Sequence, residues 1–476
     1  MPETLTPDIC VIGAGSGGLT VAAAAAAFGV SVVLIEKGEM GGDCLNYGCV
    51  PSKAMLAAAK HAQAIREAPQ FGVMAPPDFP VDHRKVNAHV KAVIAAIAPN
   101  DSVERFTAMG VQVIRARAQF TSRKTVSAGD YEIKARRFVV ASGSSPLVPP
   151  IPGLDTVDYF TNETLFENTR KLQRLVIIGG GPIGLEMAQA HQRLGSQVTV
   201  LEAATALGKD DPEAAAILLE HLRGEGIDIR EGTKVTRVER RGKTGVRIYV
   251  ESGGAEEIVE GTHLLLAVGR AANVEDMGLD AARIRYDRKG IKVNNQLRTS
   301  NSRVYAIGDC AGGLQFTHVA GYHAGLVVRK ILFRFAPKPD NSIIPWVTYT
   351  DPELAHVGML ENELRSKERN IHVLRWPYHE NDRAQAERKT NGHIKVVTDA
   401  KGRIKGTTIV GANAGELVNL WALAISKQMT LRDIAGYVPP YPTMGETGKR
   451  AAVTFYAPLA RKPLIRSVIV LLRKLG

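Results

Sequence analysis

The sequence predicts an α/β fold in which one strand, turn, helix and strand unit occurs twice. The first copy is "DICVIGAGSGGLTVAAAAAAFGVSVVLIEKG" and the second is "RLVIIGGGPIGLEMAQAHQRLGSQVTVLEAA". Each has a short apolar strand, a G-x-G-x-x-G turn, a helix, and a second strand that ends in glutamate. The distance from first glycine to glutamate is the same in both, 36 − 13 = 23 and 202 − 179 = 23. This repeat predicts two Rossmann-like dinucleotide-binding domains.

The glycines and glutamates of the repeat are the predicted dinucleotide contacts. Glycines let the backbone approach a pyrophosphate, which the helix N-terminus binds through free N–H groups and its dipole. A carboxylate at the end of the second strand accepts hydrogen bonds from a ribose diol. Two such sites suggest one flavin and one nicotinamide, with electrons passing between them. The predicted contacts are Gly13, Gly15, Gly18 and Glu36 in the first copy and Gly179, Gly181, Gly184 and Glu202 in the second.

The composition is that of a soluble, globular chain with two to four domains. It has 476 residues, of which 45% are hydrophobic and 23% charged. The acidic, polar start predicts no secretory signal, and the early apolar run is too short to span a bilayer. The formal charge is +12, but the basic residues are scattered and form no nucleic-acid motif, so nucleic acid is not an expected partner. No structural metal site is expected.

The four cysteines favour a reducing, cytoplasmic setting, because they are too few for a disulfide framework in a chain of this length. Two of them, Cys44 and Cys49, lie close together in "GGDCLNYGCVPSKAML", which favours a catalytic pair over a structural one. Cys10 and Cys310 occur in apolar strand and turn contexts, and we predict that both are buried structural thiols.

The order of the motifs resembles the class I flavoprotein disulfide reductases, which include dihydrolipoamide dehydrogenase, glutathione reductase and mercuric reductase. The cysteine segment resembles their redox-active disulfide, and "VYAIGDCAGGLQFTHVAGYHAG" their second flavin-binding motif. "VVASGSSPLVPPIPG" and "LLAVGRAANVE" resemble the two crossings between domains, and "YTDPELAHVG" the start of the dimerisation domain. The resemblance covers nearly the whole chain. It implies FAD, NADH or NADPH, and a homodimer whose active sites draw on both chains.

The motif order implies five successive parts of the chain. Two Rossmann-like domains are followed by an α+β dimerisation domain, with the nicotinamide domain inserted into the flavin domain. The expected bounds are 1–150 for the first part of the FAD domain, 151–270 for the NAD(P) domain, 271–340 for the second part of the FAD domain, 341–460 for the dimerisation domain, and 461–476 for a basic amphipathic tail.

The resemblance also implies residue roles. Cys49 is the thiolate nearer the flavin and Cys44 the interchange thiol facing the substrate, and a helix N-terminus lowers a thiol pKa. Lys53 approaches flavin N5, and Glu186 is its partner. Asp309 binds the flavin ribitol, and Gly143 and Gly269 are further cofactor contacts. Because Glu202 repels a 2′-phosphate and the following "AATALGKDD" has no early arginine, NADH is expected to be preferred over NADPH.

The C-terminal motif departs from the disulfide reductases. In "VPPYPTMGETGKRAA", Glu446 is in place, but Tyr441 stands where the family's proton-donating histidine would be. A tyrosine with a pKa near 10 is a poor proton shuttle compared with an imidazole near 6.5. The motif is similar to that of mercuric reductase, although this chain has no C-terminal cysteine pair. Cys44 and Cys49 could still bind a soft metal ion transiently.

Three functions remain open at this stage. The leading one is a mercuric-reductase-like NAD(P)H enzyme that passes electrons through FAD and Cys44/Cys49 to a metal ion or other small electrophile. The second is dihydrolipoamide dehydrogenase or another disulfide reductase. The third is a subunit without catalysis, docked in a larger assembly.

The tail "RKPLIRSVIVLLRKLG", residues 461–476, predicts a basic amphipathic helix. It is too short and too charged to span a bilayer. Two interpretations stay open: the helix packs on the dimer, or it makes weak contact with an anionic membrane surface.

Overall fold

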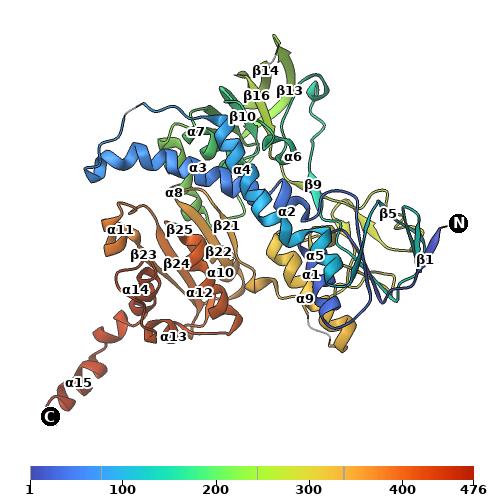
Figure 1. The fold of residues 1–476 in the computed structure, drawn as a ribbon. Helices are drawn as coiled ribbons and strands as arrows, with labels where there is room; N and C mark the ends of the chain where they lie inside the picture. The colour runs from blue at the N-terminus through green and yellow to red at the C-terminus, as the bar shows by residue number, and fades with distance from the viewer. Residues whose placement is uncertain (1, 77, 244, 336–337, 476) are drawn as a thin grey trace. The chain divides into compact units, whose positions relative to one another are not determined.

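The computed structural model describes residues 2–76, 78–243, 245–335 and 338–475 (Figure 1). The chain forms two compact units. The first comprises residues 1–179, 193–197 and 235–339, and the second comprises 180–192, 198–234 and 340–476.

A five-stranded parallel sheet organises the first unit, with the strand order β20-β8-β2-β3-β4. Ile9 and Val11 belong to one apolar cluster, whereas Cys10 and Ile12 belong to another. Since alternate residues point to opposite faces and both faces are buried, these strands are apolar throughout. The strands are β2 (Ile9–Ile12), β3 (Val32–Glu36), β4 (Val111–Arg115), β8 (Arg137–Val140) and β20 (Val304–Ala306).

Helices and smaller sheets complete the first unit. Helices α1 and α9 contact each other and contribute to the same apolar cluster on one face of the parallel sheet. Helices α3 and α4 also pack together. The helices are α1 (Ser16–Ala27), α2 (Gly42–Asn46), α3 (Cys49–Glu67), α4 (His83–Ile97), α5 (Val103–Ala108), α6 (Asn162–Leu165) and α9 (Thr317–Phe333).

The remaining strands of this unit form several groups. A four-stranded sheet has the order β1-β7-β6-β5, and a three-stranded antiparallel group has the order β13-β14-β15. Strand β10 pairs in parallel with β16, and β9 pairs antiparallel with β17. Strands β18 and β19 form an antiparallel pair. These strands are β1 (Glu3–Leu5), β5 (Ala118–Ser122), β6 (Thr125–Ala128), β7 (Tyr131–Ile133), β9 (Ser144–Pro146), β10 (Arg174–Ile178), β13 (Thr233–Arg241), β14 (Gly245–Ser252), β15 (Ala255–Gly261), β16 (His263–Leu266), β17 (Arg270–Ala272), β18 (Tyr286–Asp287) and β19 (Gly290–Ile291).

The second unit is organised by an antiparallel sheet with the order β21-β22-β25-β24-β23. Helix α12 packs on β22 and β25, and α14 packs on β23 and β24. Its elements are α7 (Pro182–Arg193), β11 (Gln197–Leu201), α8 (Pro212–Gly224), β12 (Asp228–Arg230), β21 (Trp346–Thr348), β22 (Glu353–Gly358), α10 (Glu361–Lys367), β23 (Ile371–Pro377), α11 (Asp382–Ala386), β24 (His393–Asp399), β25 (Ile404–Gly411), α12 (Ala414–Ser426), α13 (Leu431–Gly436), α14 (Glu446–Thr454) and α15 (Pro463–Leu472).

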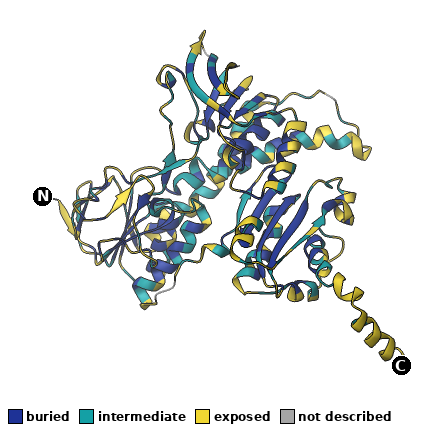
Figure 2. Cartoon of the chain, turned by 180° about the vertical axis from the view of Figure 1, so that it is seen from behind, coloured by how far each residue is buried: buried dark blue, intermediate teal, exposed yellow. Residues whose placement is uncertain are grey.

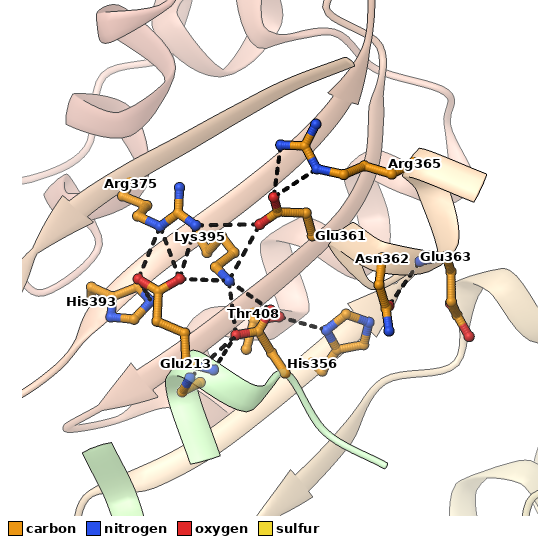
Figure 3. Close-up of polar contacts among 12 residues, drawn as sticks. Glu213, His356, Glu361, Asn362, Glu363, Arg365, Arg375, His393, Lys395 and Thr408 are labelled. Atoms are coloured by element: carbon orange, nitrogen blue, oxygen red, sulfur yellow. Dashed lines mark hydrogen bonds and ion pairs between the residues drawn. The ribbon is translucent and has the colours of Figure 1, made fainter. Parts of the chain in front are cut away.

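An ionic cluster around the buried Lys395 and Asp211 ties the start of α8 to this antiparallel sheet (Figure 3). Lys395 on β24 is 4% exposed, and its Nζ lies 2.8 Å from Asp211 Oδ2 and 2.7 Å from Glu213 Oε2. Asp211 is also the N-cap of α8, because its carboxylate accepts the backbone N–H groups of Glu213 and Ala214. Arg375 on β23 binds both carboxylate oxygens of Glu213. Burial opposes ionisation of Glu213, but the hydrogen bonds from Arg375 and Lys395 lower its pKa to about 2.

We predict that Lys395→Met lowers the free energy of unfolding at pH 7 by about 3 kcal/mol, because it leaves the buried Asp211 carboxylate without its cation. The control Lys401→Met changes an exposed lysine in a turn of the same unit.

Carboxylates with a lowered folded pKa stabilise the protein above their unfolded pKa and lose that effect as the pH falls toward the folded value. The difference between Lys395→Met and wild type should therefore shrink between about pH 4.5 and about pH 2. Denaturant titration at several pH values measures it, and a loss no larger than that of Lys401→Met would contradict the prediction.

Candidate active site

The two cysteines lie in consecutive helices, the first of which begins against the first glycine turn. Cys44 is in α2, and Cys49 is the first residue of α3. Gly41, the N-cap of α2, and Gly42, its first residue, have φ values of +87° and +62°. A Cβ on Gly42 would lie 2.8 Å from the Cα of Gly15, so the backbones are in direct contact there. Glycine at these positions is therefore required by both conformation and space.

The two thiols are unlinked and hydrogen-bonded to each other, and they differ in acidity. The hydrogen bond from Cys44, opposed by burial, is the largest influence that lowers the pKa of Cys49 to about 6. The Thr317 hydroxyl, 3.5 Å from Cys49 Sγ, and the charge of Lys53 act in the same direction. The pKa of Cys44 is raised by its hydrogen bond to Cys49 and by burial. At neutral pH Cys49 is therefore the thiolate and Cys44 the thiol, and their roles toward the flavin and the substrate stay predictions.

The remaining predicted reaction residues are placed as follows. Lys53 lies in α3 one turn after Cys49, and its charge acts on that thiol. Glu186 lies in α7, is 4% exposed, and accepts the backbone N–H of Tyr349 at 2.9 Å. The pairing of Lys53 with Glu186 stays a prediction. Cys10 and Cys310 are both fully buried, as predicted, and burial raises the pKa of each thiol.

An acidic residue that the sequence did not single out, Asp43, belongs to the first turn of α2, directly before Cys44. Its Oδ1 is 3.0 Å from Arg270 Nη2 and accepts the Asn162 side-chain amide at 3.0 Å. A Cβ on Gly48 would lie 2.7 Å from Asp43 Oδ2, so the carboxylate abuts the residue that precedes Cys49. Its negative charge raises the pKa of both thiols. Its position directly before Cys44 was the one available signal in the sequence.

Arg270 connects this carboxylate to the predicted ribitol contact. Its Nε donates to the Ser144 hydroxyl at 2.7 Å, and that hydroxyl donates to Asp309 Oδ2 at 2.5 Å. Burial raises the pKa of Asp309, whereas the Ser144 hydrogen bond and the charge of Arg270 oppose the rise. Asp43, Arg270, Ser144 and Asp309 therefore form one polar chain that runs from the cysteine segment to the second flavin-binding motif.

The first glycine turn has the geometry that a dinucleotide pyrophosphate requires. Gly13 has φ +103°, and a Cβ there would lie 2.4 Å from the carbonyl oxygen of Ala141. A Cβ on Gly18 would lie 1.8 Å from the carbonyl oxygen of Gly13, which excludes any side chain. At Gly15 the nearest atom would be the Gly42 Cα at 4.0 Å, so the backbone is accessible at the start of α1. These residues fit the pyrophosphate of FAD.

The second glycine turn repeats this geometry. Gly179 has φ +117° and its Cβ would lie 2.4 Å from the carbonyl oxygen of Ala267, while nothing lies within 4 Å of a Cβ on Gly181. Gly184 is buried in α7. Gly143 and Gly269 also have positive φ values, +69° and +121°, with open space where a Cβ would be.

The two strand-end glutamates are held in the same way. Glu36 accepts the backbone N–H groups of Ala14 at 2.6 Å and Gly38 at 2.7 Å. Glu202 accepts those of Gly180 at 2.7 Å and Ala204 at 2.9 Å. Each carboxylate is thus held by one N–H of its own glycine turn and by the N–H two residues after the glutamate, and keeps further lone pairs for a ribose diol.

Tyr441 lies in the second unit, is 70% exposed and donates its hydroxyl to Asp382 Oδ2 at 2.9 Å. This hydrogen bond raises the tyrosine pKa, and the charge of Glu446 at the start of α14 adds to the rise. Asp382, rather than Glu446, is therefore the hydrogen-bond partner. The sequence analysis missed it because 59 residues separate the two.

Known proteins similar to this chain identify the family to which it belongs. Residues 7–324 match the family described as pyridine nucleotide-disulphide oxidoreductase, and residues 344–452 match its dimerisation domain. A mercuric reductase from Staphylococcus aureus is 33% identical over 451 residues, covering 94% of this chain and 82% of that protein. A dihydrolipoyl dehydrogenase from Thermus scotoductus is 34% identical over 465 residues, covering 94% and 97%.

Among solved structures, the Cu(II) complex of the HOCl-induced flavoprotein disulfide reductase RclA from Escherichia coli superposes with a TM-score of 0.85 at 25% identity, covering 94% of this chain and 99% of that one. These comparisons confirm the predicted fold class and the use of FAD with NAD(P)H. The dimerisation domain supports the expected homodimer. The domain boundaries and the roles of individual residues stay predictions.

We predict that Asp43→Asn lowers the pKa of Cys49 below its value of about 6, because the substitution removes a negative charge that disfavours the thiolate. The rate of Cys49 alkylation by iodoacetamide in the reduced protein, followed by mass spectrometry against pH, reports this pKa. Below the wild-type midpoint the rate should rise about threefold. Glu39→Gln, which removes a carboxylate from the same loop, is the matched control and should leave the midpoint unchanged. An unchanged or higher midpoint in Asp43→Asn would contradict the prediction.

Proposed function

Because the chain belongs to the pyridine nucleotide-disulphide oxidoreductase family, we propose that it passes electrons from NAD(P)H through FAD and the Cys49/Cys44 pair to a soft metal ion or another small electrophile. When bound, FAD would supply the chemistry that transfers an electron pair from the nicotinamide to the cysteine pair. This chain's residues hold the cofactors and control the thiols. Gly13, Gly15, Gly18, Glu36 and Asp309 hold FAD, Gly179, Gly181, Gly184 and Glu202 hold the nicotinamide dinucleotide, and Gly143 and Gly269 are further cofactor contacts.

The different protonation states of the two thiols support this role. Cys49, with a pKa of about 6, is the thiolate on the flavin side, and Lys53 stabilises negative charge beside it. Cys44, whose pKa is raised, keeps its proton until it meets the acceptor. Glu186 is proposed as the partner of Lys53. This difference in pKa between the two thiols favours a redox enzyme over a subunit without catalysis.

The observation that carries the choice of acceptor is the Tyr441–Asp382 hydrogen bond. Reduction of a disulfide to two thiols consumes two electrons and two protons, so it benefits from a general acid. Reduction of Hg(II) to the element, or of Cu(II) to Cu(I), consumes electrons but no proton at the acceptor. A tyrosine whose pKa is raised by Asp382 and Glu446 is a weaker acid than an imidazolium and suits the second kind of reaction better.

The relatives include both kinds of enzyme. A mercuric reductase is 33% identical to this chain, and a structure of the reductase RclA is described as a Cu(II) complex. A dihydrolipoyl dehydrogenase is 34% identical, so reduction of a disulfide is the second candidate. Cys44 and Cys49 serve either reaction, which leaves Tyr441 as the residue that separates them. In the homodimer we propose that Tyr441 of one protomer faces the thiols of the other.

The test is the ratio of metal-ion to disulfide reduction. NADH oxidation is measured with Hg(II), Cu(II), lipoamide, glutathione disulfide and quinones, in wild type and in Tyr441→His. We expect the wild type to favour the metal ions, and the imidazole beside Asp382 to raise the disulfide activity relative to the metal activity by about tenfold.

Three variants serve as controls for this panel. Tyr441→Phe keeps the ring and should not raise the ratio. Cys44→Ser should abolish turnover with every acceptor that needs the pair, whereas Cys310→Ala, which removes a buried thiol elsewhere, should retain it. An unchanged ratio in Tyr441→His with full FAD content would overturn the assignment of this position, and a wild type selective for lipoamide would favour the second candidate.

We also predict that NADH is preferred over NADPH by about tenfold in kcat/KM. The Glu202 carboxylate, fixed by Gly180 and Ala204, accepts a ribose diol and repels a 2′-phosphate. The double variant Glu202→Ala/Ala204→Arg should narrow or reverse the preference, while Glu36→Ala should reduce FAD content instead. A wild type with the higher kcat/KM for NADPH would contradict the prediction and point to a more distant cation such as Lys209.

A further inference from the structure

The C-terminal helix has an exposed surface that the family architecture does not explain. Helix α15, Pro463–Leu472, lies beyond residues 344–452 that match the dimerisation domain. It contacts the preceding short helix at Ala457–Arg461 and contains no buried residue. Figure 2 shows the helix exposed along its length. Within the described residues, no helix combines the length and apolar character needed to cross a bilayer.

One side of this helix is apolar. Leu464, Val468 and Leu471 follow a spacing of four and three residues, Leu472 continues the stripe to the end of the helix, and Leu475 follows just beyond it. Leu464 is 76% exposed and Leu475 77%. Large apolar side chains at this exposure are unfavourable in water, so the face has the character of a binding surface.

The charged residues of this segment are all basic. Arg466 and Arg473 lie opposite the apolar stripe together with Val470, Lys474 flanks the stripe, and Arg461 and Lys462 precede the helix. Residues 457–475 contain no aspartate or glutamate. Arg466 donates to the carbonyl oxygen of Ala460 at 2.9 Å, which fixes the turn into the helix.

We propose that residues 461–475 bind the surface of anionic lipid bilayers, with the apolar stripe in the acyl boundary and the cations at the headgroups. Charge complementarity selects this partner. A second copy of the chain would bring the same five cations to the interface, on a protein with a formal charge of +12, and would be repelled. An anionic surface attracts each cation and also accepts the apolar side chains. This inference is independent of the electron acceptor.

Co-sedimentation of the FAD-loaded dimer with vesicles tests the proposal. Binding to vesicles that contain phosphatidylglycerol should exceed binding to phosphatidylcholine vesicles, weaken at high salt, and be lost on truncation after Pro463. Leu472→Asp should weaken binding at least tenfold. Val470→Asp makes the same charge change at a similarly exposed site on the opposite side of the helix, and should weaken it only about threefold.

Three outcomes would overturn the proposal. Equal binding by the full-length and truncated proteins would exclude the tail as the contact. Equal losses in Leu472→Asp and Val470→Asp would exclude insertion of the apolar stripe. A change of oligomeric state in Leu472→Asp without any effect on vesicle binding would assign the stripe to packing between copies. NADH oxidation by the truncated protein should equal that of wild type, which separates this result from the proposed function.

Discussion

The candidate site depends on direct backbone contact between the first glycine turn and the start of the cysteine segment. Gly15 pairs with Gly41, and Gly41 N–H donates to the carbonyl oxygen of Ala14 at 3.0 Å. A side chain on Gly42 would meet Gly15 itself. The loop predicted to bind the FAD pyrophosphate and the helix that carries Cys44 are therefore held as one piece. Any substitution that separates them would move the thiol relative to the flavin.

Much of the first unit could be predicted from local pattern. Turn glycines, apolar strands and strand-end acids lie within about thirty residues of one another, and the physical requirements of phosphate binding define their spacing. The structure adds that Glu36 and Glu202 make the same two backbone hydrogen bonds in both copies. The two copies therefore share a hydrogen-bond pattern as well as a sequence pattern, because equivalent positions present equivalent N–H groups to the glutamate.

The features that the sequence did not predict join residues far apart in the chain. Lys395 meets Asp211 across 184 positions, and Arg270 meets Asp43 across 227. An isolated Lys or Asp is most often a solvated surface residue, so no pattern in one sequence separates these from the other charged side chains. Tyr441 was recognised by its departure from a family motif, but its partner Asp382 required the fold of α11.

The protonation states of the site residues agree with a metal ion as the acceptor. Binding of a soft cation by both sulfurs requires Cys44 to lose its proton, whereas Cys49 at neutral pH has already lost its own. With the proposed metal ion as the acceptor, the raised pKa of Cys44 would make that proton loss depend on binding of the metal ion. A disulfide substrate offers no such assistance and requires protons to be delivered. The residue expected to deliver them is a tyrosine bonded to a carboxylate, whose pKa is raised further from neutrality. The protonation states of Cys44 and Tyr441 thus favour a metal ion, which displaces a proton from Cys44, over a disulfide, whose reduction consumes two protons.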